Sequence, residues 1–239
     1  MVASLVQRAA GIFESSGSFR MSESIPSRRP LKTRNTKWAA ALAGWLVKAG
    51  AKPNQISIAS IFFAALAGGA FAYAGQASSF SAGWLYLVAA AGIQLRLLCN
   101  MLDGMVAVEG GLRSKTGELY NELPDRFADA LILIGAGYSD IHGEMCVLAG
   151  WLAALLAVIT AYVRAIGVVA GAGQCFLGPM AKPHRMALLT AACIIAAFCA
   201  WLHFDGRIIL IALWVMVAGC GITIFRRCRQ IARELNAKK

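Results

Sequence analysis

One segment of this chain, residues 100–129, combines carboxylates, carboxamides and glycines within an otherwise apolar sequence. Ionisable side chains at membrane depth are costly unless they are paired, hydrated or bound to a metal, so such a segment is a candidate functional site. Asn100, Asp103 and Ala107 follow at intervals of three and four residues, which places them on one face of a helix. That face presents two oxygen donors beside a small residue.

A second polar set follows after a short loop that contains glycines. Gly117, Asn121 and Asp125 lie at intervals of four residues and share a face of the next helix. Because the loop is short, the two helices are expected to be antiparallel neighbours with their polar faces together, and Ala107 and the glycines leave room between them. Oxygen donors from two helices suit a hard cation such as Mg²⁺ or Mn²⁺, and such a cation suits a pyrophosphate.

The elements that position this segment are predicted to be membrane spans. The 239 residues are 59% hydrophobic, and the mean hydropathy of +0.63 leaves room for one polytopic membrane domain. Uncharged runs match the roughly 20 residues needed to cross about 30 Å of hydrocarbon, and the span that carries Asp125 must begin near Gly117. The sequence thus predicts an all-α fold of six transmembrane helices, at 55–75, 82–108, 117–138, 145–170, 186–203 and 207–226.

Basic residues are concentrated on one side of these predicted spans. Nine of the 23 Lys and Arg precede Gln55, six lie from Arg226 onward, and others lie in the 108–117 and 171–185 loops. By the positive-inside rule, both termini and the polar segment face the cytoplasm, in a multi-pass protein of the cell inner membrane. The net charge of +11 then reflects orientation and attraction to anionic membrane lipids, not binding to nucleic acid.

The predicted spans divide the chain into three parts. Trp38, Leu42 and Trp45 recur at helical spacing between lysines, as expected of an amphipathic helix at 37–48 in the headgroup layer. The segment before this helix is rich in Ser and Arg and lacks the long apolar core of a signal peptide. Translation could start at Met21. The expected parts are a poorly ordered cytoplasmic segment at 1–36, a six-helix catalytic domain with its interfacial helix at 37–228, and a basic cytoplasmic tail at 229–239.

The polar segment resembles the signature of the CDP-alcohol phosphotransferase family, which reads Asp-x-x-Asp-Gly-x-x-Ala-Arg, eight or nine residues, then Gly-x-x-x-Asp-x-x-x-Asp. The resemblance extends over 37–227, with six helices, an interfacial helix and cytoplasmic termini. The spacer between the two halves of the motif is the eight residues 109–116. The matching positions are Asn100, Asp103, Gly104, Ala107, Gly117, Asn121 and Asp125.

Three positions depart from this signature. Asn100 and Asn121 stand where the family has aspartates, and Val108 stands where it has an arginine. The four acidic positions therefore carry a charge of −2 instead of −4, because a carboxamide ligates a cation without charge. Metal affinity should fall to that of a weakened or single-metal site unless nearby acids compensate. The candidates are Glu109, Glu118, Glu122 and Asp129, of which Glu122 and Asp129 are the best placed.

The resemblance implies an enzyme of phospholipid biosynthesis. It would transfer a phosphatidyl group from a CDP-linked lipid, CDP-diacylglycerol, to the hydroxyl of a small polar alcohol and release CMP, with Mg²⁺ or Mn²⁺ required. Asp125 inherits the role of general base. Metal ligation is implied for Asn100, Asp103, Asn121 and Asp125, and contact with the cytidine nucleotide for Gly104, Ala107 and Gly117. The family tends to dimerise, so a homodimer is one arrangement that the resemblance allows.

Basic residues outside the motif point to the same site. Arg164 is the only charge in the fourth predicted span, so it should face the carboxylates or bind phosphate, unless it extends to the interface. Lys182 and Arg185 lie in a predicted cytoplasmic loop, where they either bind an acceptor that carries phosphate or only set topology. Arg96, one turn before Asn100, is expected to pair with a motif carboxylate.

Other functions remain open from the sequence. An intramembrane prenyltransferase also uses aspartate-rich helices and Mg²⁺, although it usually has two separate aspartate-rich motifs. A catalytically retired family member or a small membrane transporter would explain the asparagines. The acceptor is equally open, with glycerol 3-phosphate, inositol phosphate and serine as candidates.

Overall fold

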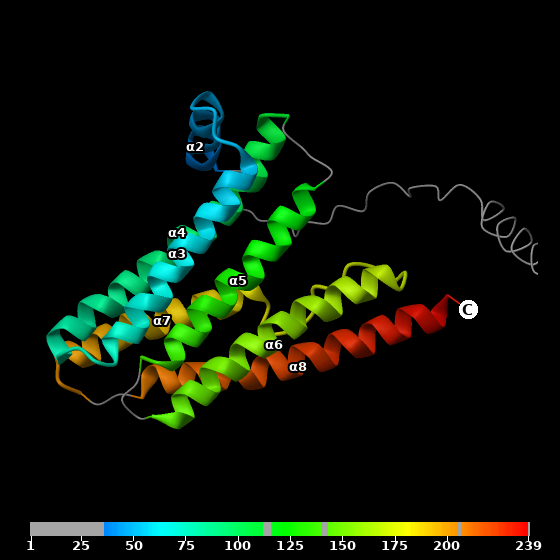
Figure 1. Cartoon of the computed structure of the whole chain (residues 1–239). Helices are drawn as coiled ribbons and strands as arrows, with labels where there is room; N and C mark the ends of the chain where they lie inside the picture. The colour runs from blue at the N-terminus through cyan, green and yellow to red at the C-terminus, as the bar shows by residue number, and fades with distance from the viewer. Residues whose placement is uncertain (1–35, 112–115, 140–142, 205–206, 239) are drawn as a thin grey trace, which may run out of the picture. The chain divides into compact units, whose positions relative to one another are not determined.

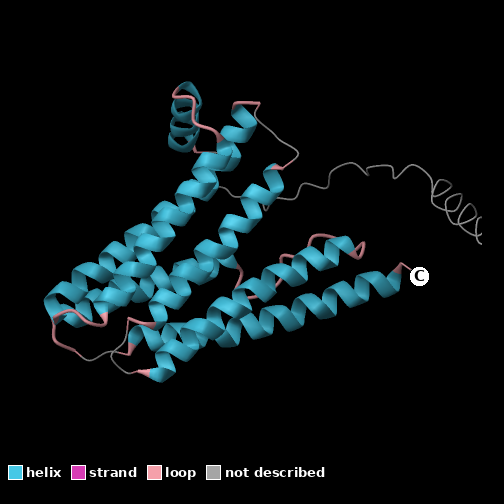
Figure 2. Cartoon of the chain, in the orientation of Figure 1, coloured by secondary structure: helices cyan, strands magenta, loops and turns pink. Residues whose placement is uncertain are grey.

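The computed structural model describes residues 36–111, 116–139, 143–204 and 207–238. Within these ranges the secondary structure is entirely helical, as predicted (Figures 1 and 2). The expected disorder of the N-terminal segment, and the choice between Met1 and Met21 as start, concern residues outside these ranges. The described helices are α2 (Lys37–Lys48), α3 (Pro53–Ala74), α4 (Ser79–Glu109), α5 (Gly117–Gly137), α6 (Glu144–Val169), α7 (Lys182–Trp201) and α8 (Ile208–Ala237).

Five of the described helices, α3, α4, α6, α7 and α8, are long and apolar enough to cross a membrane. The helix α5 has 21 residues, a sufficient length, but its charged side chains exclude it by composition. Charges that are paired inside the protein do not face lipid, so composition alone underestimates such a helix. The prediction of a sixth span therefore stays a prediction for α5.

The helices pack as two groups that share α5 (Figure 1). In the first group α3 lies beside α4 and α5, and in the second α6 lies beside α5 and α8. The helix α7 joins the groups because it packs against both α4 and α8. The ends of α4, α5 and α7 that carry the polar residues therefore approach one another.

Small residues allow close contact between these helices. A Cβ on Gly135 of α5 would lie 2.4 Å from the Gly68 carbonyl oxygen of α3. On the other side of α5, a Cβ on Gly150 of α6 would lie 2.7 Å from the Gly137 Cα. Membrane helices associate through such small residues, because lipid offers no hydrophobic driving force between them.

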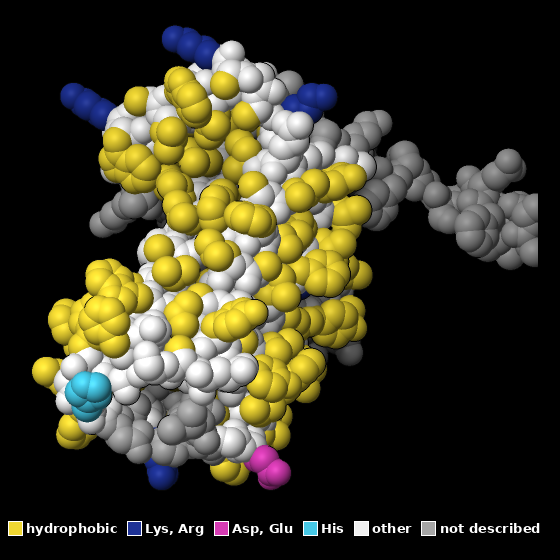
Figure 3. Space-filling model, turned by 60° about the vertical axis from the view of Figure 1, so that its left-hand side comes forward, with side chains coloured by type: hydrophobic (Ala, Val, Ile, Leu, Met, Phe, Trp, Pro, Cys, Tyr) yellow, Lys and Arg dark blue, Asp and Glu magenta, His cyan; other side chains and the backbone are white. Residues whose placement is uncertain are grey.

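The amphipathic helix predicted at 37–48 is α2, with the same bounds. Its buried face, Ala39 and Ala43, packs near Met101 and Met105 of α4, while Trp38 and Trp45 are exposed. Figure 3 shows that hydrophobic side chains cover much of one face of the molecule and that charged ones gather largely at its ends. This distribution is what a lipid-facing surface requires, and the place of α2 in the headgroup layer stays a prediction.

Two predicted helix boundaries were wrong. The predicted fifth span, 186–203, begins earlier, as α7 at Lys182, because Pro183 in the first turn of a helix favours its start. Lys182 and Arg185 therefore lie in the first turn of a helix rather than in a loop. The predicted sixth span, 207–226, continues as α8 to Ala237, so most of the expected tail is helical.

Candidate active site

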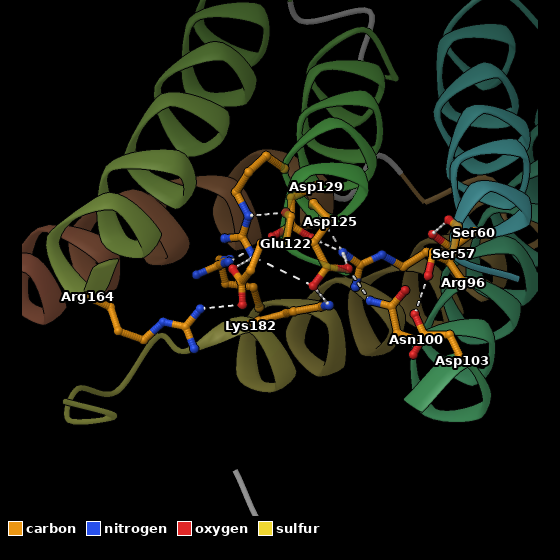
Figure 4. A network of polar contacts seen from close by, with 12 residues as sticks. Ser57, Ser60, Arg96, Asn100, Asp103, Glu122, Asp125, Asp129, Arg164 and Lys182 are labelled. Carbon is orange, nitrogen blue, oxygen red and sulfur yellow. Dashed lines mark hydrogen bonds and ion pairs between the residues drawn. The ribbon is translucent and has the colours of Figure 1, made fainter. Parts of the chain in front are cut away.

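Asp125 is the meeting point of three helices (Figure 4). Its Oδ1 accepts a hydrogen bond from the Asn100 amide of α4, and its Oδ2 pairs with the Lys182 ammonium of α7. Arg96 Nη2 of α4 lies 3.4 Å from Oδ1, and Arg126 Nη2 lies 3.6 Å from Oδ2. Asp125 is buried, so these contacts replace the water that a carboxylate otherwise requires.

Asp129, one turn further along α5, holds two buried arginines. Arg96 Nη2 lies 2.6 Å from its Oδ1, and Arg185 Nη2 lies 2.8 Å from its Oδ2. Arg185 Nη1 also donates to the Met180 carbonyl oxygen at 3.0 Å. All three charged side chains are almost completely buried. The expected pairing of Arg96 with a motif carboxylate is confirmed, although its shortest contact is with Asp129.

Glu122 lies one turn before the Asp125–Asp129 pair and connects α5 to α6. Arg164 Nη2 lies 2.6 Å from Glu122 Oε1, so the arginine faces a carboxylate, as expected. Arg126 Nη2 lies 3.4 Å from Glu122 Oε2. The Arg164 guanidinium also lies over the Phe176 ring, 5.7 Å from its centroid. Unlike Asp129, the Glu122 side chain is 39% exposed, so this pair borders solvent or lipid headgroups.

Asp103 is held by α3. The Ser57 hydroxyl donates to Asp103 Oδ2 at 2.6 Å, and the Ser60 hydroxyl donates to the Ser57 carbonyl oxygen at 2.6 Å. Figure 4 shows Asp103 beside Asn100, on the end of α4 that faces Asp125. Sequence reasoning missed both serines, because Ser is common in apolar spans and has no spacing signal there. It also missed Arg126, which the spacing of four from Glu122 could have indicated.

The remaining motif residues lie on the same ends of α4 and α5. Gly104 is buried, Ala107 is half-buried, and Gly117 is the first residue of α5. Asn121 is half-buried, one turn before Asp125. Of the other acids, Glu109 is exposed at the last position of α4, and the Glu118 side chain is outside the described part of the chain.

The carboxylates present would hold a divalent cation only together with other oxygen donors. Among the described residues, no three Asp, Glu, His or Cys side chains gather closely enough to hold a metal ion. Glu122 and Asp129, the acids expected to compensate for the asparagines, are paired with arginines. Asp103 and Asp125 with two carboxamides still offer oxygen donors, and Mg²⁺ is commonly held by one or two carboxylates together with substrate phosphates.

The balance of charge around Asp125 favours an anionic ligand. Three acidic side chains, Glu122, Asp125 and Asp129, are paired with five basic ones: Arg96, Arg126, Arg164, Lys182 and Arg185. The excess positive charge lies where α4, α5, α6 and α7 meet. Arg164 and Lys182 keep 19% and 23% of their side chains exposed, so they are accessible to a ligand.

No protein-family model matches the chain, and no curated protein matches it in sequence. Solved structures do match. The Mycobacterium tuberculosis phosphatidylinositol phosphate synthase PgsA1 with CDP-DAG bound has a TM-score of 0.68 and 17% identity, over 82% of this chain and 94% of that one. This chain shares the fold of that synthase.

Two further structures of the same synthase agree. Its complex with manganese and citrate has a TM-score of 0.67 and 17% identity, over 81% of this chain and 88% of that one. Its apo form has a TM-score of 0.65 and 18% identity, over 80% of this chain and 94% of that one. At this identity the likeness concerns the fold, and the roles of the site residues remain predictions.

Proposed function

We propose that this chain is an integral-membrane phosphatidyltransferase of the CDP-alcohol phosphotransferase family. It transfers the phosphatidyl group of CDP-diacylglycerol to the hydroxyl of a small polar alcohol and releases CMP. The observation that carries the proposal is the convergence of Asn100, Asp125 and Lys182 from three helices. This convergence occurs in a chain whose fold is that of a synthase solved with CDP-DAG bound.

The reaction assigns a proton transfer to Asp125. The acceptor hydroxyl loses its proton to the Asp125 carboxylate while its oxygen bonds to the phosphorus next to the lipid. The bond from that phosphorus to the bridging oxygen breaks, and CMP leaves with the electron pair. A bound Mg²⁺ or Mn²⁺ would neutralise charge on the pyrophosphate, with Asp103, Asp125 and the two carboxamides as its proposed ligands. The hydroxyl must replace one present partner of Asp125 to reach it.

The basic residues have two different proposed roles. Arg164 and Lys182 are partly exposed and would bind the phosphates of the donor or of an acceptor that carries phosphate. Arg185 was also predicted to bind the acceptor, but its ion pair with Asp129 is buried. We propose that Arg185 instead stabilises the Asp129 carboxylate and the first turn of α7. Gly104, Ala107 and Gly117 would line the nucleotide, because small residues allow close approach of a ligand to the backbone.

The proposed membrane arrangement has six spans, with α5 as the third. Three of its described carboxylates, Glu122, Asp125 and Asp129, pair with basic residues of α4, α6 and α7 rather than facing lipid. An even number of spans places both termini on one side of the membrane. By the positive-inside rule, the basic residues indicate that this is the cytoplasmic side of the inner membrane. The helix α2 then lies in the cytoplasmic headgroup layer beside the active site.

The deciding experiment measures CMP release from CDP-diacylglycerol by the purified protein in nanodiscs. The acceptor panel contains glycerol 3-phosphate, inositol phosphate and serine, each with Mg²⁺, with Mn²⁺ and with EDTA. Metal-dependent release with one acceptor, absent in Asp125→Asn, is expected. No release with any acceptor would instead favour the catalytically retired protein or the transporter. A prenyl diphosphate in place of CDP-diacylglycerol tests the prenyltransferase alternative.

A further inference from the structure

We propose that the Lys182 ammonium takes the place of a second cation at Asp125, so that the chain works with a single divalent ion. This inference rests on the proposed function and deepens it, because it concerns how the same site neutralises its substrate. It starts from an ion pair between α5 and α7, which joins residues 57 positions apart in the chain.

Both oxygens of the Asp125 carboxylate already have a donor. Lys182 Nζ contacts Oδ2, and the Asn100 amide nitrogen donates to Oδ1. An aspartate at position 100 would bring a second carboxylate against Oδ1, and the two would repel unless a cation lay between them. Asn100 removes that requirement, and Lys182 supplies a positive charge that is covalently attached to the chain. The asparagine and the lysine therefore act together.

The position of Lys182 at the start of its helix supports a role in binding an anion. Lys182 is the first residue of α7, where the helix already carries a partial positive charge. A lysine is unfavourable there unless a negative group faces it. In the described structure that group is Asp125, and a substrate phosphate would be attracted by the same charge and by the same helix end. The lysine side chain remains 23% exposed, so a ligand can reach it.

The remaining donors suit one divalent ion. Asp103 is held in place by the Ser57 hydroxyl. The carboxamide oxygens of Asn100 and Asn121 would add neutral ligands. The other two acids already form ion pairs. Glu122 pairs with Arg164, and Asp129 pairs with Arg96 and Arg185. A second divalent ion would have to displace Lys182 from Asp125, and it would gain only neutral ligands from the two asparagines.

The test counts Mn²⁺ ions bound per chain, by electron paramagnetic resonance with CDP-diacylglycerol in nanodiscs. The wild-type chain should bind one ion. The double variant Asn100→Asp with Asn121→Asp should still bind one while Lys182 is present, and should bind two when Lys182→Gln is added. In the wild-type background, Lys182→Gln should raise Mn²⁺ affinity about tenfold, because a positive charge close to the ligands is removed.

Two controls separate this role from general charge. Lys182→Arg keeps the charge and should leave the Mn²⁺ affinity close to that of the wild type. Arg126→Gln removes a basic group 3.6 Å from Asp125 that lies on the same helix, and it should raise the affinity less than Lys182→Gln does. Size-exclusion chromatography verifies that each variant is folded.

Two bound Mn²⁺ ions in the wild type would overturn the inference without any variant, and so would the absence of Mn²⁺ binding. An unchanged affinity in folded Lys182→Gln would overturn it as well. CMP release is measured separately. Turnover with two bound ions would refute only the role of Lys182, whereas one bound ion without turnover for any acceptor would refute only the proposed function.

Discussion

Asp125 contacts residues of α4, α5 and α7, and the proposed reaction requires its carboxylate to accept a proton. The variant Asp125→Asn keeps the shape of the side chain but removes the base. We expect CMP release to fall by about 100-fold or more, the scale at which general bases contribute. The variant should still fold, as size-exclusion chromatography can show, because Arg96 keeps Asp129 as its partner and Lys182 is partly exposed. Activity at the wild-type level in this variant would exclude Asp125 as the base.

Asp129 should matter for stability rather than for chemistry. Removing one partner of a buried ion pair leaves uncompensated charge, and Asp129→Asn should therefore destabilise the protein by about 3–5 kcal/mol. Glu122→Gln is the matched control, because the Glu122 side chain is 39% exposed, and its loss should cost less than about 1 kcal/mol. Thermal unfolding in detergent compares the two. Equal shifts in the two variants would show that burial does not distinguish these carboxylates.

The motif residues could be found from the sequence because their spacing matches the period of a helix. Asn100 and Asp125 do meet, as the two polar faces predicted. The partners of Asp129 could not be chosen in this way. Arg96 and Arg185 lie on other helices, and only packing decides which carboxylate each arginine reaches. The motif residues around Asp125 were therefore predictable from the sequence, whereas Arg126 was missed and the pairing of the charged side chains did not follow from the motif.

At the scale of helices, the contact between α3 and α5 depends on glycine. A Cβ at Gly135 would lie 2.4 Å from both the Cα and the carbonyl oxygen of Gly68, and backbone cannot move aside as a flexible side chain can. We expect Gly135→Ala to destabilise the protein by about 1–3 kcal/mol, the usual cost of overpacking.

Gly69, the residue after Gly68 in α3, provides the control for Gly135→Ala. A Cβ there would meet nothing within 4 Å. Gly69→Ala should stabilise α3 slightly, by up to about 1 kcal/mol, because alanine is the better helix former. Thermal unfolding of both variants measures the difference. Destabilisation by Gly69→Ala as large as that by Gly135→Ala would contradict close packing as the cause.

Helix ends were less predictable than helix existence. Hydropathy indicates the part of a helix that is apolar, not the residue at which the helix begins. For this reason Lys182 was expected in a loop, and the basic residues after Arg226 were expected in a tail, although both segments are helical. The bounds of α2 were correct, because apolar residues at helical spacing lie between two lysines, Lys37 and Lys48, which mark its ends.

At the scale of the whole molecule, the number of spans decides the topology. Six spans place the N-terminus and the C-terminus on one side of the membrane, whereas the five spans selected by composition alone would place them on opposite sides. We expect green fluorescent protein to fluoresce when fused at either end, and alkaline phosphatase to be inactive at both. Opposite results at the two ends would show that α5 does not cross.

The overall fold was the most predictable level. Apolar runs and loop charges led to a helical membrane domain, and the arrangement of helices matches that of a solved synthase at only 17% identity. Such a match is expected because helix lengths and small-residue contacts are retained by many sequences. The acceptor alcohol does not follow from these features, since its contacts depend on individual side chains.

The buried link from Arg96 through Asp129 to Arg185 also bears on biosynthesis. In the proposed arrangement, α4 leaves the ribosome before α5, and α7 follows only after α6. When α5 enters the bilayer, Arg96 is already present to form an ion pair with Asp129. Arg185 adds the second ion pair to Asp129 once α7 has been made. The lone carboxylate would otherwise oppose insertion. The order of the helices in the chain thus supplies Asp129 with a basic partner by the time it reaches the lipid.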